Sequence, residues 1–152
     1  MPTLFPVRRT SAAVAVMITL FSTLLVGLGG GSADAGTIGQ QAVSEASRHQ
    51  GQPYVYGAAG PTRFDCSGFT LYVYGRFGKR LAHSASTQYS QTRHIAKYSK
   101  AVGDLIFMRE SSGRIGHVGI YAGGNRWWVA PKSGDHVKLQ TLYSTNYVVG
   151  RP

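Results

Sequence analysis

The sequence predicts a single α+β domain in which helices come first and an antiparallel sheet follows. Its 152 residues leave room for one ordinary hydrophobic core and not for two. Apolar residues make up 43% of the chain and charged residues 14%, which is typical of a folded protein and excludes a largely disordered one. Apolar spacings of three and four residues occur in the first half, and short apolar runs between glycine-rich turns occur in the second.

Three helices are expected before residue 93. Residues 38–49 form a modest amphipathic helix that Gly51 and Pro53 end. A buried helix is expected from Cys66 to about Arg76, because its apolar residues recur at spacings of three and four: Phe69, Tyr72, Val73 and Phe77. A polar helix is predicted over residues 84–92. Between the first two helices lie a short extended piece at 54–57 and a loop.

Five strands are expected after residue 101. Each is a short apolar run bounded by turn residues, and the runs are 104–108, 115–121, 126–130, 135–139 and 147–151. The basic stretch before them, up to Lys100, shows no clear periodicity. Helices followed by strands describe an α+β domain with an antiparallel sheet.

Residues 1–35 have the three-part pattern of a secretory signal peptide. Arg8 and Arg9 precede an uncharged, mostly apolar stretch at 11–28, and the small-x-small sequence Ala33-Asp34-Ala35 follows. Cleavage after Ala35 would leave a domain of residues 36–152 and predicts a secreted or wall-located protein. The alternative is an uncleaved membrane anchor, because about 18 apolar residues are just long enough to span a bilayer.

The charge of the chain predicts an anionic partner or surface. Lys and Arg number 16 against 6 Asp and Glu, a formal net charge of +10. The excess lies in the domain, because residues 1–35 hold only two of the basic residues and one acidic residue. The basic residues are scattered along the chain and are not grouped with aromatic residues in a stripe, so a nucleic-acid partner is not expected.

Cys66 is the only cysteine, which excludes an internal disulfide, a cysteine-based zinc cage and an iron–sulfur cluster. It opens the second expected helix, where unpaired backbone amides stabilise a thiolate. Asp65 is able to cap the same helix end. A free cysteine is unusual in an exported protein, which favours a reactive thiol over the alternative of a buried structural cysteine.

His117 is the histidine that best suits a reactive thiol. A thiol nucleophile needs an imidazole to exchange protons with. In the expected strand, Gly116 and Gly119 flank His117 and predict open space around its ring. The other four histidines lie in polar surroundings, and of these His83 and His136 are possible pocket residues.

The expected hairpin after His117 places Val129 opposite it. If residues 122–125 turn the chain, the numbers of cross-strand partners sum to about 246. The residue opposite the imidazole would be suited to orient it by a hydrogen bond, as the third member of a catalytic triad does. Valine has no group that makes such a bond.

Four ordered segments of this sequence resemble the NlpC/P60 family of bacterial cell-wall cysteine peptidases. They are Tyr-Val-Tyr-Gly at 54–57, Phe-Asp-Cys-Ser-Gly-Phe at 64–69, Val-Gly-Asp-Leu-Ile-Phe at 102–107 and Gly-His-Val-Gly-Ile-Tyr at 116–121, and Ala-Pro-Lys-Ser-Gly at 130–134 continues the match. The resemblance covers about residues 40–151. It implies a papain-like α+β fold in which the helix bearing the nucleophile packs on a central antiparallel sheet.

The same resemblance implies hydrolysis of amide bonds in peptidoglycan stem peptides, typically between D-γ-glutamyl and a diamino acid, without a metal or organic cofactor. It assigns Cys66 as nucleophile and His117 as general base. The other matching positions imply contacts with the substrate or the reacting atoms: Tyr54, whose hydroxyl lies beside the thiol, Asp65 and Ser67 at the substrate's amine end, and Ser84 in the pocket.

One position departs from the family pattern. The third polar residue of the family, commonly histidine, asparagine or glutamine, falls at Val129. Either Cys66 and His117 work as a dyad whose ring is held by packing or a backbone carbonyl, or another polar side chain substitutes.

The sequence therefore supports two functions. The first is an exported peptidoglycan endopeptidase that acts through a cysteine thiolate. The second is a catalytically weak cell-wall binding module of the same fold, which Val129 and the aromatic residues Trp127 and Trp128 suggest. In either case the positive charge would attract the domain to anionic wall polymers.

Overall fold

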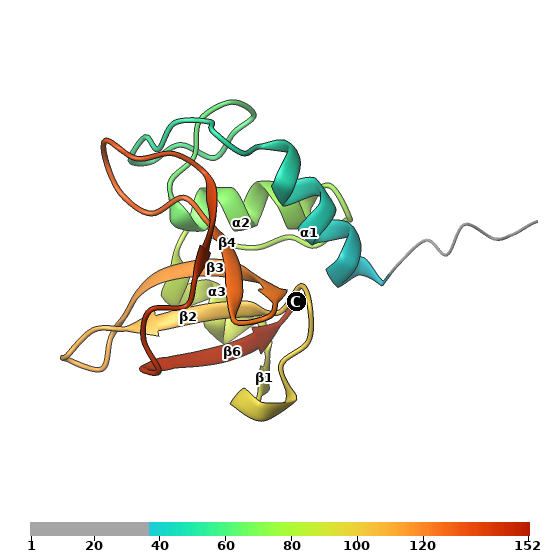
Figure 1. Ribbon diagram of the computed structural model, residues 1–152, viewed down its shortest axis with the longest axis vertical. Helices are drawn as coiled ribbons and strands as arrows, with labels where there is room; N and C mark the ends of the chain where they lie inside the picture. The colour runs from blue at the N-terminus through green and yellow to red at the C-terminus, as the bar shows by residue number, and fades with distance from the viewer. Residues whose placement is uncertain (1–36) are drawn as a thin grey trace, which may run out of the picture. The chain divides into compact units, whose positions relative to one another are not determined.

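The structure, a computed structural model, describes residues 37–152 and confirms an α+β fold in which helices precede the sheet (Figure 1). The helices are α1 (Ile38–Arg48), α2 (Cys66–Gly75) and α3 (Ala85–Gln91). After them come β1 (Arg93–Ile95), the short 3-10 helix η1 (Lys97–Ser99), β2 (Leu105–Arg109), β3 (Ile115–Gly123), β4 (Arg126–Val129), β5 (Lys138–Thr141) and β6 (Tyr147–Arg151). The predicted signal peptide lies outside the described residues. Within residues 37–152, no helix is both long and apolar enough to cross a membrane.

Each helix begins where a polar side chain accepts a hydrogen bond from an unpaired backbone amide. Thr37 and Gln40 form a capping box at α1, in which each side chain accepts a bond from the other's backbone N–H, at 3.3 Å and 2.9 Å. Asp65 caps α2 and Ser84 caps α3. The predicted helix boundaries are therefore nearly correct, because polar capping residues mark them in the sequence.

The strands form one sheet in the order β1-β6-β2-β3-β4-β5, and every neighbouring pair is antiparallel. The sequence predicted β2, β3, β4 and β6 to within two residues. It did not predict β1, which lies in the basic stretch without periodicity and pairs with β6 at the edge of the sheet.

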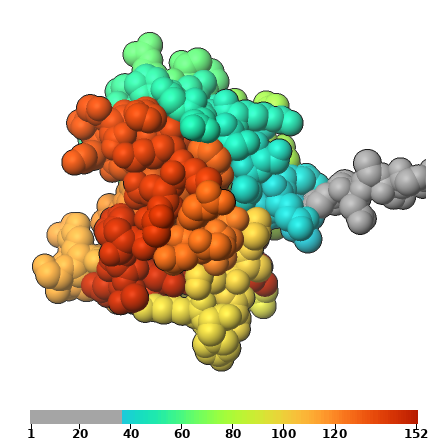
Figure 2. Space-filling model, viewed as in Figure 1, coloured from blue at the N-terminus to red at the C-terminus, as the bar shows by residue number. Residues whose placement is uncertain are grey.

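The prediction of a strand over residues 135–139 is wrong in its first half. β5 begins later, because the preceding residues pair with the loop that follows α1 instead of with β4. The Val137 N–H donates to the Gln52 carbonyl at 2.8 Å, and the Tyr54 N–H donates to the Asp135 carbonyl at 2.9 Å. Figure 2 shows these two segments in contact, the loop in teal and its partner in orange-red. The loop that carries Tyr54 is thus attached to the sheet.

The alternation of side chains along the strands divides the core into two clusters, one on each face of the sheet. The face covered by α1 and α2 in Figure 1 carries Leu105, Phe107, Val118 and Ile120, which pack with Phe69 and Val73 of α2. The opposite face carries Ile106, Met108, Trp127, Val129 and Val149. Because β3 alternates in the same way, Val118 faces the helices and His117 faces the second cluster.

A loop at residues 57–59 lies directly against the first turn of α2. The Asp65 N–H donates to the Ala58 carbonyl at 2.8 Å, and the Gly57 N–H donates to the Asp65 carboxylate at 2.9 Å. This approach requires glycine at position 68, where a Cβ would lie 2.0 Å from the Ala58 oxygen. The start of α2 therefore packs directly on the backbone of this loop, and a residue larger than glycine at position 68 would push the two apart.

We expect Gly68→Ala to lower the free energy of unfolding by about 1–3 kcal/mol, because the added methyl group must push the loop away from the helix. Gly75→Ala is the matched control on the same helix, since a Cβ there meets nothing within 4 Å. It should leave stability unchanged or raise it by up to about 1 kcal/mol. Urea denaturation of both variants measures the difference, and equal stability would contradict the contact.

Candidate active site

Cys66 is the first residue of α2, and its free thiol is partly buried. The backbone N–H groups of Val118, Ser67 and Cys66 itself bond to the sulfur and favour the thiolate. Burial and, after it, the nearby Asp65 carboxylate act in the other direction, and together they raise the pKa of the thiol. The contact with Val118 brings the sulfur to β3, next to the backbone of His117.

His117 lies on β3 and is packed against an aromatic ring. Its imidazole meets the Trp127 indole edge to face, with ring centroids 5.3 Å apart and planes inclined at 83°. Burial lowers the pKa of His117 to about 4. Neither ring nitrogen has a hydrogen-bond partner among residues 37–152, so packing on Trp127 is what orients the ring.

The directions of these two pKa changes determine the resting charge of the pair. With the pKa of Cys66 raised and that of His117 lowered, both groups are neutral at neutral pH. A neutral imidazole is able to accept a proton from the thiol as the sulfur attacks an electrophile. The two groups therefore do not form a preformed thiolate–imidazolium ion pair.

The predicted position of Val129 opposite His117 is wrong. β3 and β4 pair Ile120 with Trp128 and Tyr121 with Trp127, a register that brings Val129 level with Gly119. The difference in register arises from the turn between β3 and β4. Gly124 and Asn125 both have positive φ, 57° and 58°, which is typical of a two-residue type I′ turn, so the chain reverses later than predicted.

A register shift of two residues keeps each side chain on its face of the sheet, so Val129 still lies on the same face as His117. It is fully buried in the cluster of Ile106, Met108 and Trp127. Val129, which the resemblance assigns to the third position of the family pattern, is thus part of the hydrophobic core in this protein.

The glycines around His117 do not leave open space, contrary to the prediction. At Gly119 a Cβ would lie 2.5 Å from the nearest Val129 side-chain carbon and 2.6 Å from Trp127. At Gly116 it would lie 2.4 Å from a Glu110 carboxylate oxygen. These glycines instead allow neighbouring side chains to pack closely over the strand.

Space beside His117 is found at two hollows that share Gly116, His117 and Tyr143. The larger, of about 530 Å³, is also lined by Pro131, Lys132, Asp135, Lys138 and Gln140. The smaller, of about 210 Å³, is also lined by Met108, Arg109 and Glu110. Lys138 is paired with Asp135 at 2.7 Å, whereas Lys132 is exposed at the edge of the larger hollow.

Tyr54 and Ser67 lie beside the acidic residue that precedes Cys66. Burial raises the pKa of Tyr54, and the charges of Cys66 and Asp65 raise it further, so its hydroxyl stays protonated and available as a donor. The Ser67 hydroxyl is buried and lies 3.4 Å from the Asp65 carboxylate. These two residues therefore share the electrostatic environment of the thiol.

Ser84 caps α3, where its Oγ accepts a bond from the Thr87 N–H at 3.4 Å. Its predicted role in the pocket stays a prediction. His83, which precedes it, makes the more direct link to the site, because its Nε2 lies 2.8 Å from the Asp65 carboxylate. His136 is largely exposed beside Asp135.

Sequence reasoning missed Gln88, which is fully buried in α3 and connects three segments around Cys66. Its amide nitrogen donates to the carbonyls of Ser67 and Ala82, at 2.9 Å and 2.7 Å, and its amide oxygen accepts from the Thr70 hydroxyl at 2.7 Å. Ala85 and Tyr89 of the same helix also pack on the core, so their spacing marks this face of α3, but a glutamine gives no sequence signal of burial.

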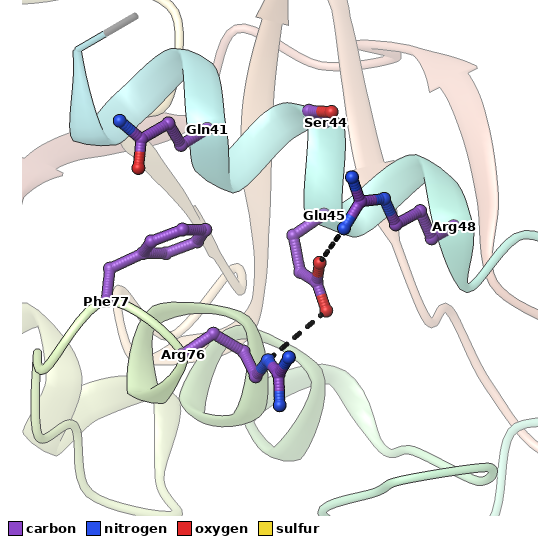
Figure 3. A pocket seen from close by; sticks show the side chains of 6 residues that line it. All are labelled: Gln41, Ser44, Glu45, Arg48, Arg76 and Phe77. Atoms are coloured by element: carbon purple, nitrogen blue, oxygen red, sulfur yellow. Dashed lines mark hydrogen bonds and ion pairs between the residues drawn. The ribbon is translucent and has the colours of Figure 1, made fainter. Parts of the chain in front are cut away.

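A third hollow, of about 250 Å³, lies between α1 and the end of α2 (Figure 3). The buried Glu45 carboxylate at its centre pairs with Arg48 at 3.0 Å and Arg76 at 3.6 Å. This charge cluster connects the two helices, and none of the predicted site residues lines the hollow. Within the described part of the chain, no group of three or more His, Cys, Asp or Glu residues is arranged to hold a metal ion.

Comparisons with known proteins agree with this geometry. The sequence profile of the NlpC/P60 family matches residues 51–149. The probable endopeptidase p60 of Listeria grayi is 41% identical over 110 residues, which cover 70% of this chain and 21% of that protein. The gamma-D-glutamyl-L-lysine dipeptidyl-peptidase of Bacillus subtilis is 33% identical over 99 residues, which cover 64% of this chain and 33% of that protein.

Among solved structures, the NlpC/p60 domain of the peptidoglycan hydrolase SagA superposes with a TM-score of 0.68 and 34% identity. The match covers 75% of this chain and 98% of that one. By contrast, the chain spans only about a fifth of the length of the p60 protein. The likeness is thus to one domain of a longer relative.

The lowered pKa of His117 predicts how stability depends on pH. The unfolded chain binds a proton on this imidazole near pH 6.5, whereas the folded chain binds it near pH 4. The free energy of unfolding should therefore decrease as the pH falls from about 6.5 to about 4. We expect His117→Gln to weaken this dependence, as measured by urea denaturation at intervals across the range. Other titrating groups contribute equally to both proteins, so parallel curves would contradict the burial of a neutral imidazole.

Proposed function

Since this chain belongs to the NlpC/P60 family, we propose that its domain is a peptidoglycan hydrolase that cleaves amide bonds of stem peptides through Cys66. The observation that carries the proposal is the position of the only thiol at the start of α2, bonded to the backbone N–H that follows His117. Support also comes from the relatives, whose names describe an endopeptidase and a dipeptidyl-peptidase.

In the proposed reaction, the neutral His117 imidazole takes the thiol proton as the Cys66 sulfur attacks the scissile carbonyl carbon. The backbone N–H of Cys66 and the Tyr54 hydroxyl donate hydrogen bonds to the oxyanion that forms. The imidazolium then protonates the leaving amine as the C–N bond breaks, which leaves a thioester. A water molecule, deprotonated by His117, attacks the thioester and releases the acid, and the thiol regains its proton.

The proposed bond joins D-γ-glutamyl to the diamino acid of the stem peptide. The name of the Bacillus relative, which contains gamma-D-glutamyl-L-lysine, supports this choice. Asp65 and Ser67 would contact the amine end of the substrate, and Ser84 would line the same pocket.

We propose further that the protein acts outside the cytoplasmic membrane. Support comes from the sequence pattern of residues 1–35 and from the excess of 16 basic over 6 acidic residues, which would attract the domain to anionic wall polymers. N-terminal sequencing of the protein from culture medium and wall fractions should find a chain that begins at Gly36. A chain retained in the cytoplasm with Met1 intact would contradict export.

A second function has a specific observation in its favour. Val129 is apolar where the family has a polar residue, and the imidazole has no hydrogen-bond partner among the described residues. A base that lacks an orienting hydrogen bond lowers the rate of a reaction without abolishing binding. The domain could accordingly act as a cell-wall binding module with weak catalysis.

Digestion of purified muropeptides of defined linkage, with mass spectrometry of the products, separates the two functions. We expect cleavage between D-glutamate and the diamino acid, and a loss of at least about a thousandfold in rate for both Cys66→Ala and His117→Ala. Comparison of substrates with diaminopimelate and with lysine identifies the preferred diamino acid.

His94→Ala is the matched control, because His94 is an exposed histidine stacked on Tyr89 at the β1 edge of the sheet. It should cleave at the wild-type rate. Circular dichroism confirms that each variant is folded. Full activity in Cys66→Ala would refute the mechanism, and sacculus binding without cleavage by the wild-type protein would favour the binding module.

A further inference from the structure

Asp65 makes four polar contacts at the start of α2 and is 7% exposed. One carboxylate oxygen accepts from the Gly68 N–H at 2.6 Å, lies 3.4 Å from the Ser67 hydroxyl and lies 2.8 Å from His83 Nε2. The other oxygen accepts from the Gly57 N–H at 2.9 Å. The carboxylate is therefore needed for the helix cap and for the adjacent loop, whatever its effect on the thiol.

The charge of Asp65 is unfavourable for ionisation of the Cys66 thiol. The negative charge of Asp65 raises the pKa of the adjacent Cys66 thiol, because two anions close together in a partly buried site repel each other. It raises the pKa of Tyr54 in the same way. A site that relies on Cys66 as a nucleophile consequently benefits from a positive charge on the far side of Asp65.

His83 is the only basic side chain in the described chain that contacts Asp65. Hydrogen bonds fix the segment that carries His83. The preceding residue, Ala82, is held at both backbone groups, since its N–H donates to the Gln91 side chain at 2.8 Å and its carbonyl accepts from Gln88 at 2.7 Å. Gln88 also bonds the Ser67 carbonyl in the first turn of α2. The segment bearing His83 is thus attached to the helix that bears Cys66.

Other charged and titratable groups do not replace His83 in this contact. Lys79 and Arg80 lie on the same loop, but neither forms an ion pair with Asp65. On the facing loop, neither Tyr54 nor Tyr56 supplies a positive charge. His117 lies on β3, packed on Trp127, and it forms no ion pair with Asp65.

We propose that His83 is a positioning residue that balances the charge of Asp65 and so increases the reactivity of the Cys66 thiol when its imidazole is protonated. The proposal deepens the proposed function, because it takes Cys66 as the nucleophile. His83 itself does not touch the reacting atoms.

The test measures the alkylation of Cys66 by iodoacetamide from pH 6 to pH 9.5, followed by mass spectrometry of the intact protein. Cys66 is the only cysteine, so every adduct reports this thiol. His83→Gln keeps a hydrogen-bond donor for Asp65 without charge, whereas His83→Arg keeps a positive charge at every pH. His94→Gln is a control outside the site.

At pH 6 we expect alkylation of His83→Gln to be about three- to tenfold slower than that of the wild-type protein, an effect of half to one pKa unit. The difference between the two rates should shrink as the pH rises, because only a protonated imidazole balances the carboxylate charge. His83→Arg should stay faster than His83→Gln across the whole range. The His94→Gln profile should equal that of the wild-type protein.

Equal rates for His83→Gln and wild type at every pH would overturn the proposal. So would equal slowing of His83→Gln and His83→Arg, because a purely structural role does not distinguish charge. If His83→Gln loses its helical circular dichroism, the comparison of wild type with His83→Arg at the highest pH measured still decides, since the arginine variant must then be the faster. Muropeptide cleavage is measured separately: a protein with the expected alkylation profile that cleaves nothing refutes the proposed function alone.

Discussion

The carboxylate of Asp65 is the constraint on which the site depends. It caps α2, holds the loop of residues 57–59 and meets His83, so three segments distant in sequence converge on one buried group. A buried carboxylate is stable only where donors surround it, and here two backbone N–H groups, a hydroxyl and an imidazole do so. The same charge lies next to the thiol and opposes its ionisation. Structural stability and chemical reactivity are therefore in conflict at this residue.

This conflict explains the electrostatic character of the site. The thiol and the imidazole are both neutral at rest, because burial acts on each of them and Asp65 adds to the effect on the thiol. In the proposed reaction the thiol proton moves to the imidazole, so the orientation of the His117 ring becomes important. Trp127 supplies that orientation by packing, in place of the hydrogen bond that a polar residue at position 129 would make in the family pattern.

Much of the fold and part of the site could be predicted from local patterns. The second helix follows from apolar spacing and its capping aspartate, and both signals lie within a few neighbouring residues. Cys66 was identified because it is the only thiol and opens a helix, and His117 because of its strand. The register of Val129 was predicted wrongly, since it depends on the positive φ angles of Gly124 and Asn125, which the sequence suggests only weakly.

The amino-acid sequence by itself determined the α+β class, the order of helices and strands and the family, and it singled out the two side chains proposed to react, because short-range periodicity and ordered motifs encode them. Only the tertiary structure decided that Gln88 and His83 meet the start of α2, that the residues before β5 pair with the loop bearing Tyr54, and that His117 rests on Trp127. These contacts join residues far apart in the chain. Their energies depend on distance, burial and the exclusion of water, none of which exists until the sheet and helices have packed together.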